Sequence, residues 1–345
     1  MASKDASGHN PLLDWRPDPS AIAFVGRDLQ RPECILAVPD GTLFTADARG
    51  GVMRIAPDGT QRLIAQEGPH PPDAPAASPS LLDGTLPNGL AFDRNGDFLI
   101  SNFGTDRLER MDGTGRTTVL LDSIEGTPLG KVNFVLRDSR NRLWVTVSTR
   151  VNPWSDAIRK DLDDGYVVLI DARGARIVAD GLHFTNELRL DAREAWLYVA
   201  ETTAKRITRF RVTADGSLVD REIFGPSSLG RGLIDGIAFD ACGNLWGTMI
   251  LADRLIALTP RGDLIELLDD GDRAGLDRFE AAFATGRPVS FETMLGCGGT
   301  LAPLITSVTF GGPDLRTVYL GSLKGDRLPA FRSPVAGQPM AHWRF

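Results

Sequence analysis

Histidine and cysteine are scarce in this sequence, with only 4 histidines and 3 cysteines among 345 residues. The cysteines, Cys34, Cys242 and Cys297, lie far apart and form no C-x-x-C pair. This spacing argues against a disulfide framework and against a cysteine zinc site. We therefore expect three reduced thiols, as is usual for a cytoplasmic protein.

The sequence also lacks a long apolar segment and an excess of positive charge. No run approaches the ~18 apolar residues of a membrane span, and the N-terminus shows no apolar signal segment. The formal net charge of −7 provides no basic surface, so neither a nucleic acid nor a membrane is an expected partner. We expect a cytoplasmic protein whose partner is a small-molecule substrate.

Turn-forming residues are abundant, with 37 glycines and 22 prolines, and they predict many short strands rather than long helices. One cassette recurs among these strands. In residues 233–246, LIDGIAFDACGNLW, the acidic Asp235 is followed five positions later by Asp240, then by a turn and an apolar strand. The pattern can be laid over five other places, and the leading residues are Glu33, Asn88, Asn133, Asn186, Asp235 and Thr306.

A second, more polar alternating segment and a turn of the Asp-Gly type follow most cassettes. A repeat of roughly 45–55 residues with about four short strands is typical of a β-propeller. Six cassettes therefore predict an all-β fold, a six-bladed β-propeller formed as a single domain by residues 21–345 after a flexible segment at residues 1–20. A short strand at residues 21–24 is expected to pair with the last blade and close the ring.

Three insertions interrupt the repeat. Residues 66–85 are rich in proline and predict a loop. Residues 150–165 contain a possible short helix at 154–162, and residues 269–300 have apolar residues at helical spacing at 276–283. We expect the second and third insertions to cover one mouth of the central channel, as lids or as substrate walls.

If each cassette opens the inner strand of its blade, the leading residues form one ring at the channel mouth. Two carboxylates and three amides then converge there, and crowded like charges favour a bound cation. Oxygen ligands without histidine or cysteine favour a hard divalent metal ion, Ca²⁺ first, with Mg²⁺, Mn²⁺ and Zn²⁺ left open. The alternative is that these residues only cap turns, which is our interpretation of the aspartates at the fifth following position: Asp93, Asp138, Asp191 and Asp240.

The segments NGLAFD at residues 88–93 and DGIAFD at residues 235–240, with the spaced Glu33, Asn133 and Asn186, resemble the gluconolactonase and regucalcin (senescence marker protein) family. That family is related to the diisopropylfluorophosphatase and paraoxonase propellers. The resemblance implies a six-bladed propeller with a central metal site, usually for Ca²⁺, that hydrolyses lactones. It also implies that Glu33, Asn133, Asn186 and Asp235 hold the metal, and that Lys131 matches an arginine used for substrate contact.

A metal ion with open positions would polarise a lactone carbonyl while water attacks it. Asp235 is the expected acceptor of the proton of that water. His183 is a further candidate base by resemblance to paraoxonase-type sites, although a lone histidine before a strand also suits a structural role. The predicted substrate contacts are Asn88, Lys131, Arg150 and Trp154. Arg150 and Trp154 stand where sugar-lactone members can offer a carboxylate, and they suit a less polar ester.

One departure from the family pattern is Glu187, which replaces the glycine after Asn186. Strand alternation predicts that Glu187 points away from the channel and pairs with Arg189 or Arg206. The chain has no G-x-S-x-G motif, and Cys34 beside Glu33 should also face away, so no nucleophilic mechanism is indicated. The alternatives to lactone hydrolysis are phosphotriester hydrolysis on the same scaffold and a non-catalytic, metal-stabilised propeller that binds a ligand.

Overall fold

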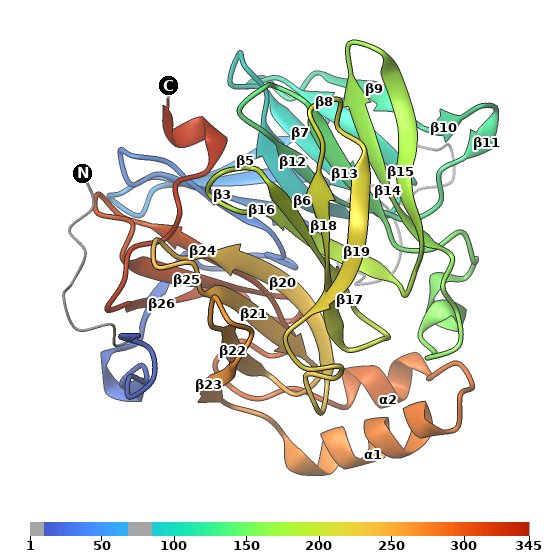
Figure 1. The fold of residues 1–345 in the computed structure, drawn as a ribbon. Helices are drawn as coiled ribbons and strands as arrows, with labels where there is room; N and C mark the ends of the chain where they lie inside the picture. The colour runs from blue at the N-terminus through green and yellow to red at the C-terminus, as the bar shows by residue number, and fades with distance from the viewer. Residues whose placement is uncertain (1–9, 68–84, 345) are drawn as a thin grey trace.

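The computed structural model describes residues 10–67 and 85–344. Within these ranges the chain forms six four-stranded antiparallel sheets and one two-stranded hairpin (Figure 1). Five of these sheets run from an inner strand to an outer strand in chain order, and the sixth takes its outer strand from the N-terminal part of the chain. Successive inner strands pack against one another. The sheets therefore surround a central axis as blades, which confirms the predicted all-β, six-bladed β-propeller.

The inner strands are β2 (Ile35–Ala37), β6 (Pro87–Phe92), β12 (Val132–Arg137), β16 (Thr185–Leu190), β20 (Leu233–Phe239) and β24 (Ile305–Gly311). The second strands are β3 (Leu43–Asp47), β7 (Phe98–Asn102), β13 (Leu143–Val147), β17 (Trp196–Glu201), β21 (Leu245–Ile250) and β25 (Thr317–Ser322). The third strands are β4 (Gly51–Ile55), β8 (Arg107–Met111), β14 (Gly165–Asp171), β18 (Arg206–Val212), β22 (Arg254–Leu258) and β26 (Leu328–Arg332). The outer strands are β5 (Gln61–Ala65), β9 (Thr117–Leu121), β15 (Gly174–Leu182), β19 (Leu218–Phe224), β23 (Leu264–Asp269) and β1 (Ala23–Val25). The hairpin comprises β10 (Ser123–Ile124) and β11 (Thr127–Pro128).

Burial falls from the inner to the outer strands. Every residue of β20 is buried, whereas the outer strand β19 buries only Phe224. Large aromatic side chains on the second strands, Trp144 and Trp246 among them, are fully buried between blades. Because an inner strand is covered on both faces, its apolar residues do not need to alternate with polar ones. The few polar residues on these strands are therefore the ones that need a chemical explanation.

The N-terminal part of the chain closes the ring. Strand β1 pairs antiparallel with β26, with Ala23 opposite Ala330 and Val25 opposite Leu328. This confirms the predicted closing strand, which supplies the edge partner that β26 would otherwise lack. The segment before it is attached rather than loose over residues 10–20, because Leu12 is fully buried and the ring of Trp15 lies 5.9 Å from that of Trp246. The expectation of a flexible N-terminal segment is corrected for these residues, and residues 1–9 lie outside the described part of the chain.

The aspartates at the fifth cassette position hold the turns between the inner and second strands, as predicted. Asp138 accepts a hydrogen bond from the indole Nε1 of Trp144 at 3.0 Å, and Asp240 accepts one from Nε1 of Trp246 at the same distance. Each of the two also accepts backbone N–H groups of its own turn. Asp93 and Asp191 make equivalent bonds to turn N–H groups. These carboxylates are structural groups of the blades.

The second and third insertions lie at one end of the propeller, as predicted. The second contains the 3-10 helix η2 (Trp154–Ala157), and the third contains α1 (Arg273–Ala284) and α2 (Phe291–Leu295). Figure 1 shows α1 and α2 lying across this end of the disc. The proline-rich insertion falls mostly on residues outside the described part of the chain. Two further 3-10 helices are η1 (Pro19–Ala21) and η3 (Ala341–Arg344). Among the described residues, no helix combines the length and the apolar character needed to cross a bilayer.

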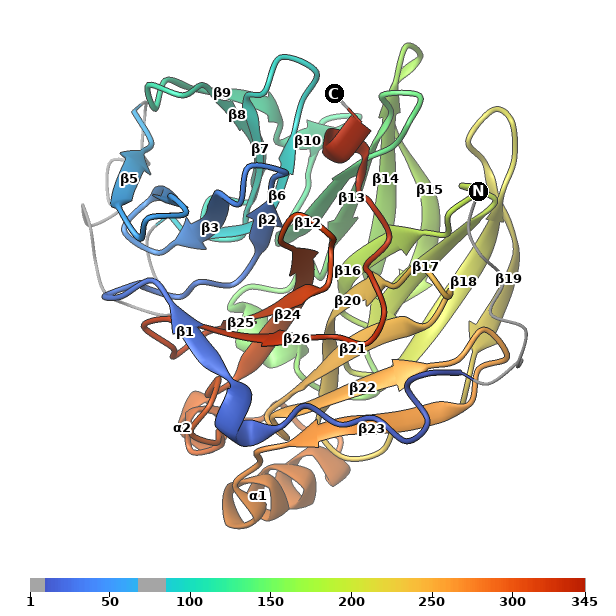
Figure 2. The ribbon, with the colours of Figure 1, turned by 90° about the vertical axis from the view of Figure 1, so that its left-hand side faces the viewer.

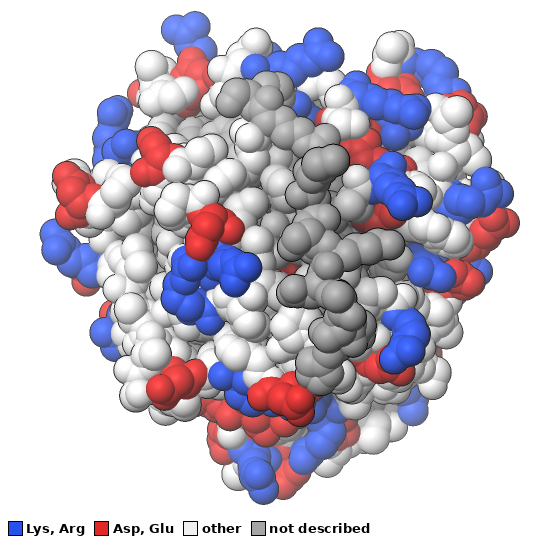
Figure 3. Space-filling view, turned by 60° about the vertical axis from the view of Figure 1, so that its left-hand side comes forward, with Lys and Arg blue, Asp and Glu red and all other residues white. Residues whose placement is uncertain are grey.

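Charged side chains of both signs are interspersed over the face drawn in Figure 3. Many of the surface arginines pair with a carboxylate of the same blade. Examples are Arg211 with Asp220 at 2.6 Å and Arg332 with Asp314 at 2.5 Å. Exposed pairs of this kind contribute little to stability, on the order of 0–1 kcal/mol each.

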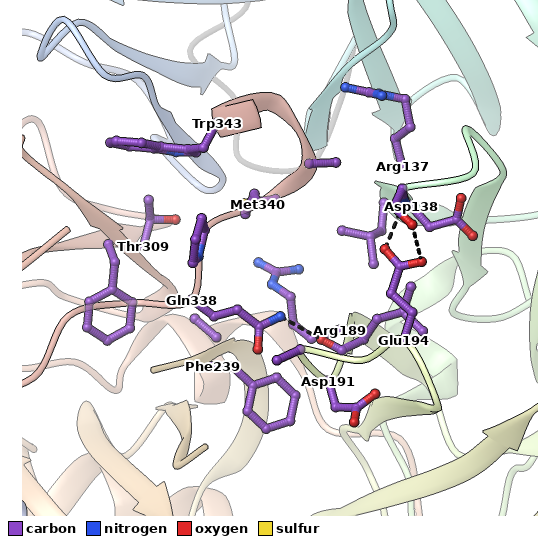
Figure 4. Close-up of a pocket in the computed structure, with 18 of the residues that line it drawn as sticks. Arg137, Asp138, Arg189, Asp191, Glu194, Phe239, Thr309, Gln338, Met340 and Trp343 are labelled. Carbon is purple, nitrogen blue, oxygen red and sulfur yellow. Dashed lines mark hydrogen bonds between the residues drawn. The ribbon is translucent and has the colours of Figure 1, made fainter. Parts of the chain in front are cut away.

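The C-terminal segment crosses the opposite end of the channel (Figure 2). The backbone N–H of Gln338 donates to the carbonyl of Phe239 at 2.8 Å, and its side-chain Nε2 donates to the carbonyl of Leu190 at 3.1 Å. Further on, Nε2 of His342 lies 2.8 Å from the carbonyl oxygen of Ala37. The segment therefore bridges the fifth, fourth and first blades. It leaves a small cavity of about 70 Å³ beside Gln338 (Figure 4).

Docking of this segment should weaken in acid through His342. Burial lowers the pKa of His342 to about 4, and the nearby charge of Arg137 acts in the same direction. In the unfolded chain the ordinary pKa is about 6.5. Protonation is therefore resisted in the folded state, so the stabilisation from neutral His342 is complete above pH 6.5 and is lost progressively towards pH 4. The advantage in the free energy of unfolding of wild type over His342→Gln should shrink by about 1–2 kcal/mol over this range. Urea unfolding of both proteins at several pH values would measure it, and a constant difference would contradict the prediction.

Candidate metal centre and active site

Five of the six leading residues line one cavity of about 90 Å³ at the end of the channel that α2 covers. These residues are Glu33, Asn88, Asn133, Asn186 and Asp235. Each comes from a different blade, and each is at most 7% exposed. The sixth, Thr306, is not among the described residues that line this cavity. Its hydroxyl donates to the backbone carbonyl of Glu33 at 3.3 Å. The structure thus brings the predicted oxygen-bearing side chains together.

A local irregularity in the inner strands places these side chains. The pairing between inner and second strand shifts register at Asn88, Asn133, Asn186 and Asp235, and again at Thr306. A β-bulge leaves a residue unpaired and changes the direction of its side chain. The repeated bulge therefore accounts for the direction of the polar side chains of Asn88, Asn133, Asn186 and Asp235, whereas Glu33 precedes its strand β2, whose pairing shows no register shift.

In the second and fifth blades, the residue after the leading position must let the neighbouring blade approach closely. A Cβ atom on Gly236 would lie 2.3 Å from the carbonyl oxygen of Thr306, and one on Gly89 would lie 2.6 Å from the Cα of Phe134. Only glycine fits at these two positions. The glycine in the DG and NG steps of the cassette is thus explained by packing between neighbouring inner strands.

The cavity also contains an arginine, Arg31, that was not among the predicted site residues. Arg31 is 8% exposed, and its Nη2 lies 2.6 Å from Oε2 of Glu33 and 3.0 Å from Oδ1 of Asn88. It precedes Glu33 by two positions and has a backbone φ of +52°, in the left-handed region. This turn of the backbone brings Arg31 and Glu33 to the same cavity. The sequence signal that could have identified Arg31 is its positive charge two positions before the predicted metal ligand Glu33.

Negative charge is in excess at the centre of the ring. Burial raises the pKa of Asp235 well above its usual value, and the carboxylates of Glu33 and Glu187 raise it further, against the lowering effects of Arg31 and of a hydrogen bond from Asn186. Burial also raises the pKa of Glu33, against the lowering effect of Arg31. Within the described part of the chain, two guanidinium groups pair with these three carboxylates, Arg31 with Glu33 and Arg189 with Glu187. A cation bound at this point would relieve the imbalance.

The donor set fits a hard divalent ion. All candidate donors are carboxylate or amide oxygens, which Ca²⁺ and related ions prefer. The Oδ1 atom of Asn133 is buried and accepts no hydrogen bond, a state that is costly for a polar atom unless a ligand satisfies it. The described residues contain no group of three or more His, Cys, Asp or Glu side chains suited to hold a metal, because this ring mixes two carboxylates with three amides.

Glu187 and Cys34 have partners away from the substrate cavity. Glu187 Oε2 pairs with Nη2 of Arg189 at 2.7 Å and accepts the backbone N–H of Ile237 at 3.1 Å. The predicted pairing with Arg189 is therefore confirmed. Burial raises the pKa of Glu187 to about 7, against the lowering effect of Arg189. Sγ of Cys34 accepts the N–H of Leu90 at 3.3 Å, and burial raises the pKa of this thiol to about 12, so Cys34 is not a nucleophile.

The other predicted site residues occupy different places. Trp154 lines the cavity, whereas Lys131, His183 and Arg150 are not among the described residues that line it. Lys131 pairs with Asp106 at 2.8 Å, and its Nζ lies 5.7 Å from the centroid of the Phe103 ring, which is part of the cavity wall. The backbone N–H of His183 donates to Glu201, and the Arg150 guanidinium stacks on Tyr166 at 4.2 Å. Substrate contact by Lys131 and Arg150, and the role of His183 as a base, stay predictions.

Similar propellers occur among solved structures. A gluconolactonase from Xanthomonas campestris superposes with a TM-score of 0.64 at 19% identity, over 92% of this chain and 94% of that one. A calcium-binding regucalcin from Agrobacterium tumefaciens superposes with a TM-score of 0.61 at 15% identity, over 93% of this chain and 98% of that one. At these identities the likeness concerns the fold.

The sequence is also similar to characterised proteins over part of its length. It is 25% identical over 186 residues to 6-deoxy-6-sulfogluconolactonase from Pseudomonas putida, covering 52% of this chain and 54% of that protein. The chain spans about half the length of the curated relatives it matches. The family model described as the SMP-30/gluconolactonase/LRE-like region matches residues 31–270, which include the five ring residues. This chain therefore belongs to the SMP-30/gluconolactonase/LRE-like family.

Proposed function

We propose that this protein is a metal-dependent hydrolase that opens a lactone or a related cyclic ester. The observation that carries the proposal is the convergence of five buried oxygen-bearing side chains, from five blades, in one cavity. Glu33, Asn133, Asn186 and Asp235 would hold the divalent ion, with Ca²⁺ the first candidate, and Asn88 would face the substrate. The lactonase named among the relatives supports this reaction class.

The reaction adds water across the ester. The oxygen of water bonds to the carbonyl carbon, the ring C–O bond breaks, and the departing oxygen takes a proton to give a hydroxy acid. A bound divalent ion supplies Lewis-acid polarisation of the carbonyl. Asp235 accepts the proton of the attacking water, and the cavity walls restrict the access of other water molecules.

Arg31 has a positioning role in this proposal. Its guanidinium holds the Glu33 carboxylate and the Asn88 amide oxygen at 2.6 and 3.0 Å, so both side chains have one defined orientation. A fixed positive charge beside the reacting carbonyl also favours the negative charge that develops on the carbonyl oxygen.

Removal of divalent ions tests the proposal. Protein treated with EDTA and then freed of chelator should lose hydrolysis of a lactone panel, and Ca²⁺, Mn²⁺ or Zn²⁺ should restore it. Restoration should be accompanied by a rise in the unfolding temperature, because an ion at 100 times its dissociation constant adds about 2.7 kcal/mol to the free energy of unfolding. KCl at equal ionic strength is the control. Lactone turnover that is indifferent to chelation would contradict the metal mechanism.

A further inference from the structure

The wall of the ring cavity is apolar on the side away from the oxygen ligands. Phe103, Trp154, Phe184, Phe291, Met294 and Leu304 all line it. Among the described residues that line it, the charged, amide and hydroxyl side chains are those of Arg31, the five ring residues and Thr202. The cavity is thus divided into a polar floor and an apolar wall, which is the usual arrangement for a ligand with one polar and one apolar part.

The wall offers few hydrogen-bonding partners for hydroxyl groups. The hydroxyl of Thr202 already donates to the carbonyl of Ile234 at 2.7 Å. Nη2 of Arg31 is used by Glu33 and Asn88. Nε of Arg31 is buried without a partner and could serve one hydroxyl group. A polyhydroxylated lactone would therefore lose water from several hydroxyl groups and replace few of their hydrogen bonds, and buried unpaired polar groups are strongly disfavoured.

Aromatic contacts link the two insertions across the cavity. The Trp154 ring lies 5.4 Å from the ring of Phe103, 6.2 Å from Phe184 and 5.0 Å from Phe291. Phe291 and Met294 belong to α2, whose N-cap Ser290 accepts the backbone N–H of Thr293. Trp154 and α2 together therefore form a continuous apolar surface above the oxygen ring.

We infer that the preferred substrate is a lactone with an apolar substituent, alkyl or aryl, on the ring carbon attached to the ester oxygen. The ester group would lie on the oxygen ring, and the substituent would contact Trp154, Phe291 and Met294. These three residues are assigned as specificity determinants rather than catalytic residues. The inference rests on the proposed lactone hydrolysis, and it names the class of lactone.

Steady-state kinetics of the metal-loaded protein on three lactones would test the assignment. The compounds are glucono-δ-lactone, δ-valerolactone and δ-nonalactone, which differ in hydroxylation and in an alkyl substituent. Burial of each additional methylene group should raise kcat/KM about fourfold. We therefore expect kcat/KM for δ-nonalactone to exceed that for glucono-δ-lactone by about 100-fold or more. An equal or higher value for glucono-δ-lactone would overturn the inference.

Variants of the wall separate selectivity from general activity. Phe291 is only partly buried and begins α2, so Phe291→Ala should fold. It should lower kcat/KM for δ-nonalactone about tenfold and that for δ-valerolactone less than threefold. Phe24→Ala is the matched control, because Phe24 is 41% exposed on β1, away from the cavity lining. If Phe291→Ala and Met294→Ala leave the ratio of the two kcat/KM values unchanged, the assigned residues are wrong.

A binding measurement keeps the inference distinct from the proposed hydrolysis. Tryptophan fluorescence of the metal-loaded protein should change on titration with δ-nonalactone but not with glucono-δ-lactone, and Trp154→Phe should abolish most of the change. If no lactone is turned over and this signal is present, the proposed function fails while the apolar selectivity of the cavity stands. Absence of any Trp154-dependent signal with δ-nonalactone would overturn the selectivity, even in a protein that hydrolyses δ-valerolactone.

Discussion

Replacement of Asp235 by alanine should lower kcat for lactone hydrolysis by about 10² or more. Asp235 is 5% exposed at the centre of the ring, and we assign it both a bond to the metal and acceptance of the proton from water. Loss of a general base alone usually reduces the rate by ~10²–10⁴. Loss of a metal ligand also weakens the binding of the ion. The decrease in kcat should therefore persist at a saturating substrate concentration, and excess Ca²⁺ should correct it only in part.

Two further variants make the result specific. Asp235→Asn retains an oxygen ligand without the proton acceptor, so calorimetry should still detect metal binding, although turnover stays low. Asp93→Ala removes a carboxylate from the corresponding cassette of the second blade, where it accepts N–H groups of its turn. It should retain at least half of the activity. Full activity in Asp235→Ala, or an equal loss in Asp93→Ala, would exclude the role assigned to Asp235.

The repeated cassette was sufficient to predict the propeller. Each copy combines a turn with apolar strands, and one copy can bury these strands only by packing against the neighbouring copies. The closing strand followed from the same reasoning, since the unpaired edge of a last blade needs a partner. The turn role of Asp138 and Asp240 was predictable too, because an aspartate followed by a tight turn accepts the N–H groups of that turn. These features depend on residues close together in sequence.

The orientation of the ring residues depends on the β-bulges of the inner strands, which a simple alternation of strand residues does not predict. In each copy with a register shift, the inner strand has one more residue than the second strand at the leading position. A rule of strict alternation therefore gives no reliable direction for the side chains of Asn186 and Glu187. The convergence of the leading residues was predicted from their spacing in six repeats, and the bulge explains how the backbone achieves it.

The cavity wall and Arg31 could not be predicted because their neighbours are far away in sequence. Phe291 meets Trp154 across more than a hundred residues, and neither helical insertion has a pattern that specifies which of its apolar side chains faces the channel. Lys131 illustrates the converse. Its position two residues before Asn133 suggested a substrate contact, but its charge is paired with Asp106, a partner from the preceding blade that sequence spacing does not reveal.

Asp240→Ala should lower the free energy of unfolding by about 3 kcal/mol, the largest stability effect we expect from a residue outside the ring. The carboxylate of Asp240 accepts four donors: the backbone N–H groups of Cys242 and Asn244, Nδ2 of Asn244 and Nε1 of Trp246. Trp246 is fully buried, so its indole N–H would be left without an acceptor. Each such unsatisfied group costs about 1–3 kcal/mol.

The acceptor oxygens, rather than the charge, should account for this effect. Burial raises the pKa of Asp240, against the lowering effect of its hydrogen bonds, which means that the charged form is penalised at this site. Asp240→Asn keeps one acceptor oxygen and should recover part of the loss. Asp314→Ala is the matched control, because Asp314 stands at the corresponding turn of the sixth blade but forms an exposed pair with Arg332. Its removal should cost less than about 1 kcal/mol.

Urea unfolding followed by circular dichroism and tryptophan fluorescence would measure the three variants against wild type. Asp240 directly follows β20, the strand that carries Asp235. If the blade is a rigid support for the site, Asp240→Ala should also weaken Ca²⁺ binding at temperatures where the protein is still folded. Equal stability of Asp240→Ala and Asp314→Ala would show that the buried Asp–Trp pair does not hold the fifth blade. A stability loss without any change in Ca²⁺ affinity would show instead that the bulge at Asp235 is fixed by its packing against the neighbouring inner strands alone.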